Sequence, residues 1–456
     1  MANQLLVRLY NVDLGDFIYL RVPDTSRDVH ILIDCGTLSK LGVLTDHLES
    51  LKQELPLDAN GKRQLDLLVV SHPHEDHHKG FIQEHFQDIS IQNLWLSPAY
   101  DRHNPKAVGF FALKDAAVRA LTSLSAFVSG QLKLEVDAIL DMTKSDIIQY
   151  LCRGMDQGIT PLFASADTPP EDLKIFEDGD IKLKVISPMS NIDGYYLGAK
   201  GLDLSVDPQA LTLSLAGEDL SMAQTQMLGA IMQQGYASLY QTEVNTQPNV
   251  PENLSVMDFE KLRSRLSSNV LALAEMTGKI ENNLSLVILL EWHGKRLLFT
   301  GDAEWSTSYK GAVKAGSCNG SWNVMWAKRK ADLSQPLDFL KVGHHGSENA
   351  TPWTPKKENK PEHPINQILE AMLPLDHADD ALAVVSTKRT NQYPSIPNRE
   401  LLEELARRVK NVETNYLETS TSPKAIPANI SQPTRTDLEL DNTGHQLPFI
   451  EVYFDQ

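Results

Sequence analysis

The sequence predicts an α/β fold in which two β-rich halves are flanked by helices, with a helical insertion at residues 195–276. Three observations support this prediction. Apolar runs of strand length recur in both halves of the chain, segments with helical periodicity lie between them, and residues 195–276 carry few strand signals. A chain of 456 residues can bury one large core or two modest ones, and we expect residues 1–456 to form one domain around the insertion.

The first half begins with a predicted β-meander. Residues 4–36 contain the apolar runs LLVRLYNV, FIYLRV and VHILIDCG, separated by turn residues. Residues 40–55 have a helical pattern, and the apolar segment LDLLVV then runs directly into a cluster of histidines and carboxylates. We expect two further core strands at residues 91–100 and 181–188, with a largely helical stretch at 107–155 between them.

The second half resumes after the insertion, which residues 245–253, rich in asparagine and proline, divide into two helical pieces. NNLSLVILLEW and KRLLFTGDAE predict a hairpin whose second strand ends at Asp302. LDFLKVGHHGS predicts a strand that ends in histidines, and ALAVVSTKR and PFIEVYF predict further strands. RELLEELARRV has the periodicity of an amphipathic helix.

The composition excludes several classes of protein. A formal net charge of −18 argues against a protein that coats nucleic acid non-specifically, although it does not exclude a nuclease. The three cysteines are scattered and never arranged as CxxC, so they suggest neither a disulfide framework nor a thiolate zinc site, and they favour a reducing compartment. The N-terminus is unlike a signal peptide, and no run of about 18 apolar residues occurs, so we expect a cytoplasmic protein without a membrane span.

The segment from His72 to His77 carries the strongest chemical signal. It reads His-Pro-His-Glu-Asp-His and follows the apolar run LDLLVV. Neutral imidazoles and carboxylates are the ligands that zinc, manganese and iron prefer, and a tight loop after a rigid strand directs several of them to one point. The alternative, an exposed histidine tract, is disfavoured because such tracts do not follow a buried strand.

Two later segments supply further candidate ligands. Asp302 follows the run LLFTG, and His344 and His345 follow FLKVG. Alone, each segment is equally compatible with an ordinary turn or with exposed histidines. Together with the first cluster they make three strand ends, and we expect these ends to converge on one metal centre.

The order of these motifs resembles the metallo-β-lactamase superfamily, and specifically the branch found in the DNA-uptake competence protein ComEC. The resemblance rests on NVDLGDFIYL, ILIDCG, VVSHPHEDHHKG, IKLKVISP, NNLSLVILL, LLFTGDAE, LKVGHHGS and VVSTKRTNQYPSIPNRELLEEL, and so covers nearly the whole chain apart from the insertions. It implies an αββα sandwich, in which each half supplies a sheet covered by helices and the metals lie at the sheet edge.

The resemblance also implies one or two divalent metal ions, with zinc as the expected metal and manganese as the alternative. His72 and His74 would bind the first ion, and Asp76 and His77 the second. Asp302 would bridge the two ions. Such ions lower the pKa of a bound water to about 7, and Asp76 and Asp302 are the residues expected to act in catalysis.

The remaining histidines are assigned less directly. His344 is expected to complete the second site, because in similar sequences the ligand is the first histidine of the pair, and His345 is expected to orient a ligand or contact the substrate. The family's further first-site histidine should follow a core strand, and His103 is the candidate near residues 91–100, although it stands in no recognisable motif. The sequence YPSIP at residues 393–397 departs from the Gly-His-Pro segment of the competence branch.

The leading function is metal-dependent hydrolysis of a phosphodiester in a nucleic acid or nucleotide, by analogy with the family. Ser386, Lys388, Arg389 and Asn391 follow a core strand where the resemblance puts groups that contact an anionic substrate, and a simple polar turn is the alternative for them. Two other functions stay open. One is a hydrolase of a small carbonyl or phosphoester compound, and the other is a regulatory partner subunit without catalysis.

Overall fold

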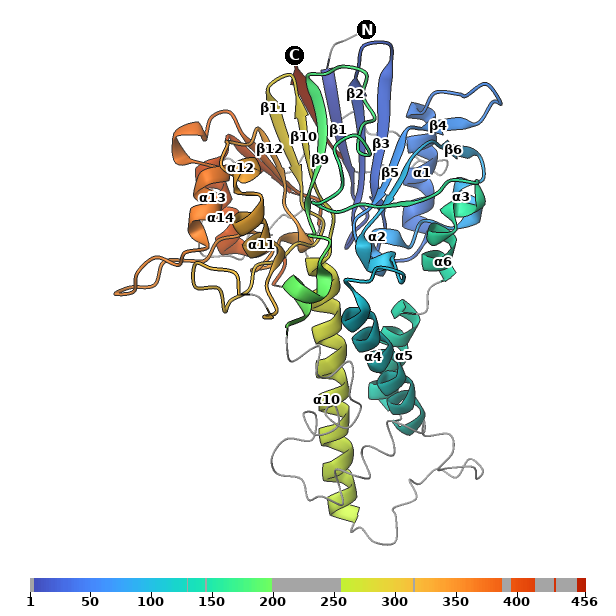
Figure 1. Cartoon of the computed structure of the whole chain (residues 1–456), viewed down its shortest axis with the longest axis vertical. Coiled ribbons are helices and arrows are strands. Elements are labelled where there is room, and N and C mark those ends of the chain that lie inside the picture. The colour runs from blue at the N-terminus through green and yellow to red at the C-terminus, as the bar shows by residue number, and fades with distance from the viewer. Residues whose placement is uncertain are drawn as a thin grey trace.

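Two seven-stranded β-sheets pack face to face, and helices cover their outer faces (Figure 1). The predicted α/β fold is therefore confirmed. The computed structural model describes residues 4–128, 130–143, 146–198, 256–314, 316–387, 395–414, 430–431 and 449–456.

The first sheet has the strand order β16-β1-β2-β3-β5-β7-β8. Its strands are β1 (Gln4–Tyr10), β2 (Phe17–Pro23), β3 (Asp28–Cys35), β5 (Leu67–Val70), β7 (Leu94–Leu96), β8 (Leu162–Phe163) and β16 (Phe449–Asp455). The predicted meander forms β1 to β3, which pair antiparallel, and β3, β5, β7 and β8 then pair parallel. The C-terminal strand β16 pairs antiparallel with β1. The short strands β4 (Arg63–Leu65) and β6 (Ile89–Ile91) form a separate parallel pair.

The second sheet has the order β15-β14-β13-β12-β11-β10-β9. Its strands are β9 (Ile181–Ser187), β10 (Val287–Trp292), β11 (Lys295–Phe299), β12 (Phe339–Lys341), β13 (Leu382–Val385), β14 (Asn411–Thr414) and β15 (Ile430–Ser431). The hairpin predicted after the insertion is β10 and β11, which pair antiparallel. From β11 to β15 all pairs are parallel, so these strands end at one edge of the sheet.

The main core lies between the sheets. Successive side chains of a strand point to opposite faces, so Val7 and Leu9 of β1 enter this core while Leu6 and Tyr10 pack under the helices outside. In the second sheet, Ile288 likewise faces the shared core. Both faces of the central strands are covered, which explains why they read as continuous apolar runs.

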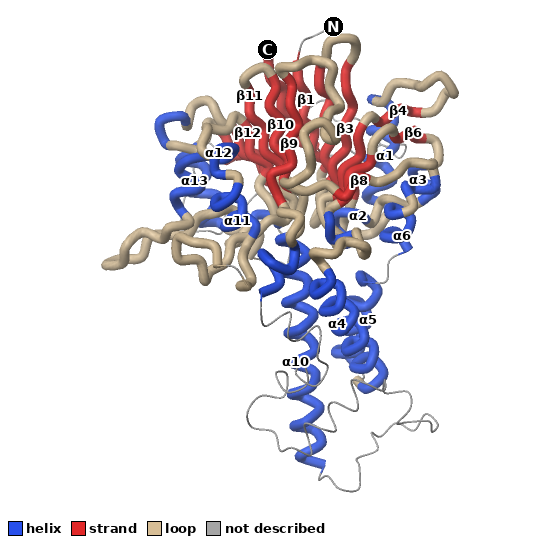
Figure 2. The backbone as a smooth tube through the Cα atoms, viewed as in Figure 1, coloured by secondary structure: helices blue, strands red, loops and turns tan. Residues whose placement is uncertain are grey.

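Helices lie outside the two sheets (Figure 2). Their apolar side chains are buried against the sheets. The first sheet is covered by α1 (Gly42–Glu54), α3 (Gln83–Phe86) and α6 (Asp146–Cys152). The second is covered by α11 (Ser321–Lys328), α12 (Lys330–Leu333), α13 (Asn366–Met372) and α14 (Arg399–Arg408). Short 3-10 turns lie at Pro98–Tyr100, Gly154–Asp156 and Leu375–His377. The predicted strand at 91–100 is shorter than expected, because Ser97 accepts the backbone N–H of Ala99 and starts the first of these turns.

Three longer helices project from one end of the sandwich (Figure 1). They are α4 (Val108–Phe127), α5 (Gly130–Thr143) and α10 (Val256–Asn283), with a π-helical turn at Asp193–Leu197 beside them. The largely helical character predicted for 107–155 is confirmed. Among the helices of the described ranges, none is long and apolar enough to cross a membrane.

Helix α10 covers the end of the predicted insertion. Residues 256–276 are helical, residues 199–255 lie outside the described part, and α10 continues past the expected boundary at 276. The apolar contacts of α10 with α4 use Val270, Leu273 and Ile280, which recur at helical spacing across that boundary. The helix therefore continues to Asn283, shortly before β10 begins at Val287.

Candidate metal centre

The candidate ligands lie on loops that follow strands of both sheets. His72 and His74 precede the short helix α2 (Glu75–His78), which follows β5, while Asp302 follows β11. The backbone N–H of Leu286 donates to the carbonyl of Ser71 at 2.9 Å, which joins the two sheets at this end. Residues about 230 positions apart in sequence are thereby brought together, as the sequence motifs predicted.

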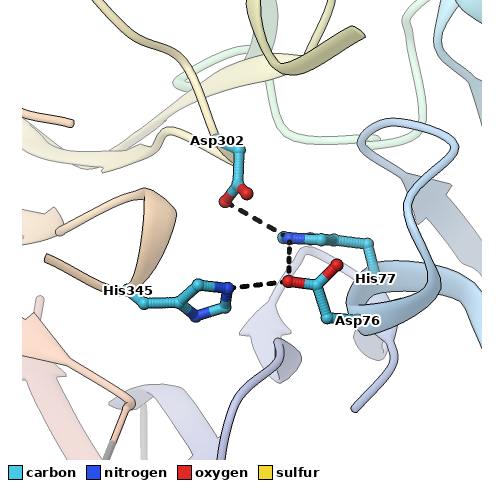
Figure 3. A group of neighbouring side chains, drawn as sticks. All are labelled: Asp76, His77, Asp302 and His345. Atoms are coloured by element: carbon cyan, nitrogen blue, oxygen red, sulfur yellow. Dashed lines mark hydrogen bonds and ion pairs between the residues drawn. The ribbon is translucent and has the colours of Figure 1, made fainter. Parts of the chain in front are cut away.

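The first group of possible ligands is Asp76, His77, Asp302 and His345 (Figure 3). One ligand atom from each lies within 4.8 Å of all the others, and all four side chains are buried. His77 Nε2 is 3.2 Å from Asp302 Oδ1 and 3.7 Å from Asp76 Oδ2. His345 Nε2 is 2.7 Å from the same oxygen of Asp76. Two imidazoles and two carboxylates therefore point at one small volume.

The second group consists of His72, His74 and Asp302. His72 Nε2 lies 3.0 Å from His74 Nδ1 and 3.7 Å from Asp302 Oδ2. Asp302 thus contributes one carboxylate oxygen to each group. A carboxylate that offers one oxygen to each of two ligand groups is arranged like a ligand that bridges two neighbouring metal ions.

The ring nitrogens that face away from the two groups are also engaged. The Nδ1–H of His77 donates to Asp34 Oδ2 at 2.8 Å. His345 Nδ1 lies 2.9 Å from Thr387 Oγ1, and His72 Nδ1 lies 3.1 Å from Ser71 Oγ. His74 faces the carboxylate of Glu281 with its Nε2. Partners of this kind set the tautomer of a histidine and leave the other nitrogen free to bind a metal.

Glu281 of helix α10 is the partner of His74. Its Oε2 lies 3.4 Å from His74 Nε2, and its other oxygen forms a buried ion pair with Lys114 of α4. Burial alone would raise the pKa of Glu281, but the Lys114 ammonium and His74 lower it to about 2. Glu281 is therefore a carboxylate at neutral pH and can hold the outer N–H of His74.

The residues present fit a divalent metal ion. Nε2 of His77 is buried without any hydrogen-bond partner in the described structure, although it faces carboxylate oxygens of Asp302 and Asp76. Burial alone would lower the pKa of His77, but the carboxylates of Asp302, Asp76 and Asp34 raise it well above its usual value. This concentration of negative charge would be neutralised by a cation between the same atoms, and imidazole and carboxylate donors suit zinc or manganese.

The group that contains Asp76 and His77 includes His345 and not His344. The sequence had favoured His344 as the histidine that completes this site. His344 Nδ1 lies 2.9 Å from Glu304 Oε1, and its Nε2 is 4.0 Å from Asp302 Oδ2. Both histidines have left-handed backbone angles, with φ of 41° and 55°. This tight turn directs His345 inward to Asp76 and leaves His344 partly exposed at the rim, with 28% of its side chain accessible.

Of the other predicted residues, those in the described ranges belong to neither group. His103 is exposed on the loop after Tyr100 and lines a separate cavity of about 580 Å³, so it does not replace a first-site histidine. Ser386 is buried, and its hydroxyl donates to Asp16 Oδ1 at 2.9 Å instead of facing solvent. Lys388, Arg389 and Asn391 lie outside the described residues.

Asp16 and Asp34 are supporting residues that sequence reasoning did not select. Asp34 accepts the backbone N–H and the hydroxyl of Ser71 at 2.7 and 2.6 Å, in addition to His77. Asp16 forms a buried ion pair with Lys341 at the end of β12. Although Asp16, Asp34 and His77 also lie close together, these bonds already occupy the carboxylate oxygens. A signal was available, since Asp16 follows Gly15 at the start of one apolar run and Asp34 stands two residues before Gly36 at the end of another.

Replacing Asp34 with asparagine is expected to weaken metal binding by about 10–100-fold. If the amide oxygen keeps its hydrogen bond from the Ser71 N–H, the amide NH2 must face His77 Nδ1. The NH2 then donates to Nδ1, so the imidazole proton moves to Nε2, and an Nε2–H cannot bind a metal. Metal affinity is measured by competition with a chromophoric chelator. Asp66→Asn is the matched control, because Asp66 is also buried and accepts a backbone N–H, but from His30. Equal affinities for wild type and Asp34→Asn would contradict the role of Asp34.

Comparison of the chain with protein-family models and with curated proteins finds no match.

Proposed function

We propose that the chain is a metal-dependent hydrolase with the αββα sandwich of the metallo-β-lactamase superfamily, and that it cleaves phosphodiesters at a centre of two divalent ions. The observation that carries this proposal is the pair of ligand groups that share Asp302. Two-metal centres of this kind are used by phosphatases and nucleases, which have to stabilise both the attacking and the leaving oxygen. The motif order described above supports the same family.

Each predicted residue takes a distinct position in the proposed centre. His72 and His74 would hold the first ion, and their Nε2 and Nδ1 atoms lie 3.0 Å apart. Asp76, His77 and His345 would hold the second ion, and Asp302, which belongs to both groups, would be shared between the two. Zinc is the metal we propose, and manganese is the alternative for a site with this mixture of nitrogen and oxygen donors.

Ions held there would lower the pKa of a coordinated water to about 7 and polarise the phosphoryl group. The chain itself supplies the alignment. Ser285 Oγ accepts the backbone N–H of Asp302 at 3.0 Å, and the backbone N–H of His344 donates to Asp302 Oδ1 at 3.0 Å. One bond thus holds the backbone of Asp302 and the other holds its carboxylate. We assign to His344, partly exposed at the rim, the substrate contact first expected of His345.

Hydrolysis of a small ester is the second candidate function, because a largely apolar cavity opens beside His74. A regulatory subunit without catalysis is disfavoured, since such a subunit has no need for histidines whose outer nitrogens are all held in place. We further propose a cytoplasmic location, which the free cysteines Cys35, Cys152 and Cys318 support.

The proposal is tested by metal analysis of the purified protein and by an activity screen in added zinc or manganese. The substrates are bis-p-nitrophenyl phosphate, single-stranded DNA, duplex DNA, RNA and p-nitrophenyl acetate. We expect one to two ions per chain and turnover of the phosphodiesters that a strong chelator abolishes. Protein that binds no metal, or that cleaves only the carboxylic ester, would overturn the phosphodiesterase assignment.

A further inference from the structure

A cavity of about 340 Å³ lies between helices α4 and α10, beside the candidate metal centre. Its walls are mostly aliphatic, and include Ala117, Val118 and Leu121 of α4 together with Leu271 and Ala274 of α10. The volume is at the lower end of the range of about 300–1,000 Å³ that small-molecule sites span. The cavity therefore has room for a small apolar group.

The floor of this cavity is polar and belongs to the metal centre. His74, Lys114 and Glu281 all line it, and Glu281 connects the other two through its two carboxylate oxygens. A group seated between the helices would thus lie next to a proposed metal ligand. The cavity combines apolar walls with a few convergent polar groups, which is typical of a substrate site.

Simple helix packing does not account for this space. Leu271 and Ala274 on its walls are half-buried and Glu275 is exposed, so the space opens to solvent. Leu124 of α4 and Val270 of α10, which do not line the cavity, are buried in a common apolar cluster, so the two helices are able to pack closely. The space next to His74 is therefore available to a ligand.

We propose that this cavity binds a short aliphatic group of the substrate, so that the hydrolysed phosphodiester carries one small alkyl ester group. The inference rests on the proposed function and narrows its substrate class. A nucleobase fits less well, because bases are usually held by stacking on large aromatic side chains and none of the lining residues is Phe, Tyr or Trp. A polynucleotide backbone also needs unpaired cations, whereas Lys114, the cation in the lining, is paired with Glu281.

The kinetic test uses methyl, butyl and hexyl p-nitrophenyl phosphate with the zinc-loaded full chain. Each added CH2 that enters the cavity is expected to raise kcat/KM by about three- to fourfold until the space is full. Ala274→Phe fills the cavity and should remove the dependence on chain length. Ala272→Phe is the matched control, because Ala272 lies on the same helix but is exposed and does not line the cavity.

Binding of methyl, butyl and hexyl phosphate, measured by calorimetry on the same variants, separates this inference from the proposed function. Affinity that rises with chain length in wild type and Ala272→Phe, but not in Ala274→Phe, supports the cavity even if every substrate resists hydrolysis. Hydrolysis and binding that are both independent of chain length would overturn the inference and leave the phosphodiesterase assignment standing. Ala274→Leu, a smaller filling, replaces Ala274→Phe if the latter does not fold, and should shorten the longest chain that gains affinity.

Discussion

Asp302→Ala is expected to reduce the metal content to less than one ion per chain and to lower phosphodiester turnover by more than about 100-fold, a loss beyond that of an outer hydrogen-bond partner. Asp302 is the side chain that both ligand groups share. Its oxygens lie 3.2 Å from His77 Nε2 and 3.7 Å from His72 Nε2, so its loss removes a ligand from each group. Elemental analysis and bis-p-nitrophenyl phosphate kinetics measure the two effects.

The control for this substitution is Asp338→Ala. Asp338 directly precedes β12 of the second sheet. Its carboxylate accepts hydrogen bonds from Lys295 Nζ at 3.0 Å and from the backbone N–H of Arg296 at 2.8 Å. It belongs to neither ligand group, so its loss should lower stability while the metal content stays unchanged. Full metal content or normal turnover in Asp302→Ala would refute the shared-carboxylate centre.

Gly36→Ala is expected to weaken metal binding by about 10–100-fold and to destabilise the fold by about 1–3 kcal/mol. A Cβ atom on Gly36 would lie 2.2 Å from the carbonyl carbon of Asp76 and 2.2 Å from the backbone nitrogen of His77. Backbone atoms cannot rotate away as a side chain does, so the segment that carries both ligands has to move. Glycine is thus required at position 36, because the loop after β3 lies close to the backbone of Asp76 and His77 there.

Gly42→Ala provides the comparison, because a Cβ at Gly42 meets nothing within 4 Å. Gly42 is the first residue of α1, where alanine is the better helix former, so this variant should be as stable as wild type or slightly more so. Thermal unfolding and chelator competition are measured for both variants. If Gly36→Ala binds metal as tightly as Gly42→Ala, the close approach of the two loops is not what positions Asp76 and His77.

The sequence by itself determined the elements whose signals are local. The strands β1 to β3, the hairpin of β10 and β11 and the helix α14 follow apolar periodicity that neighbouring residues carry. The dense ligand loop was equally visible, because His72, His74, Asp76 and His77 are adjacent in the chain and a buried strand precedes them. Because these residues are close together in the chain, their side chains can meet only in a small common volume.

Only the tertiary structure decided the features that depend on distant partners. Residue order did not show that His345 turns toward Asp76, since that choice depends on a left-handed turn and on a contact across 269 positions. Glu281 reaches His74 because α10 packs against α4, and the cavity between these helices exists only once they are packed. β16 likewise joins the first sheet through its register with β1. These contacts link segments far apart in sequence, and so no local pattern encodes them.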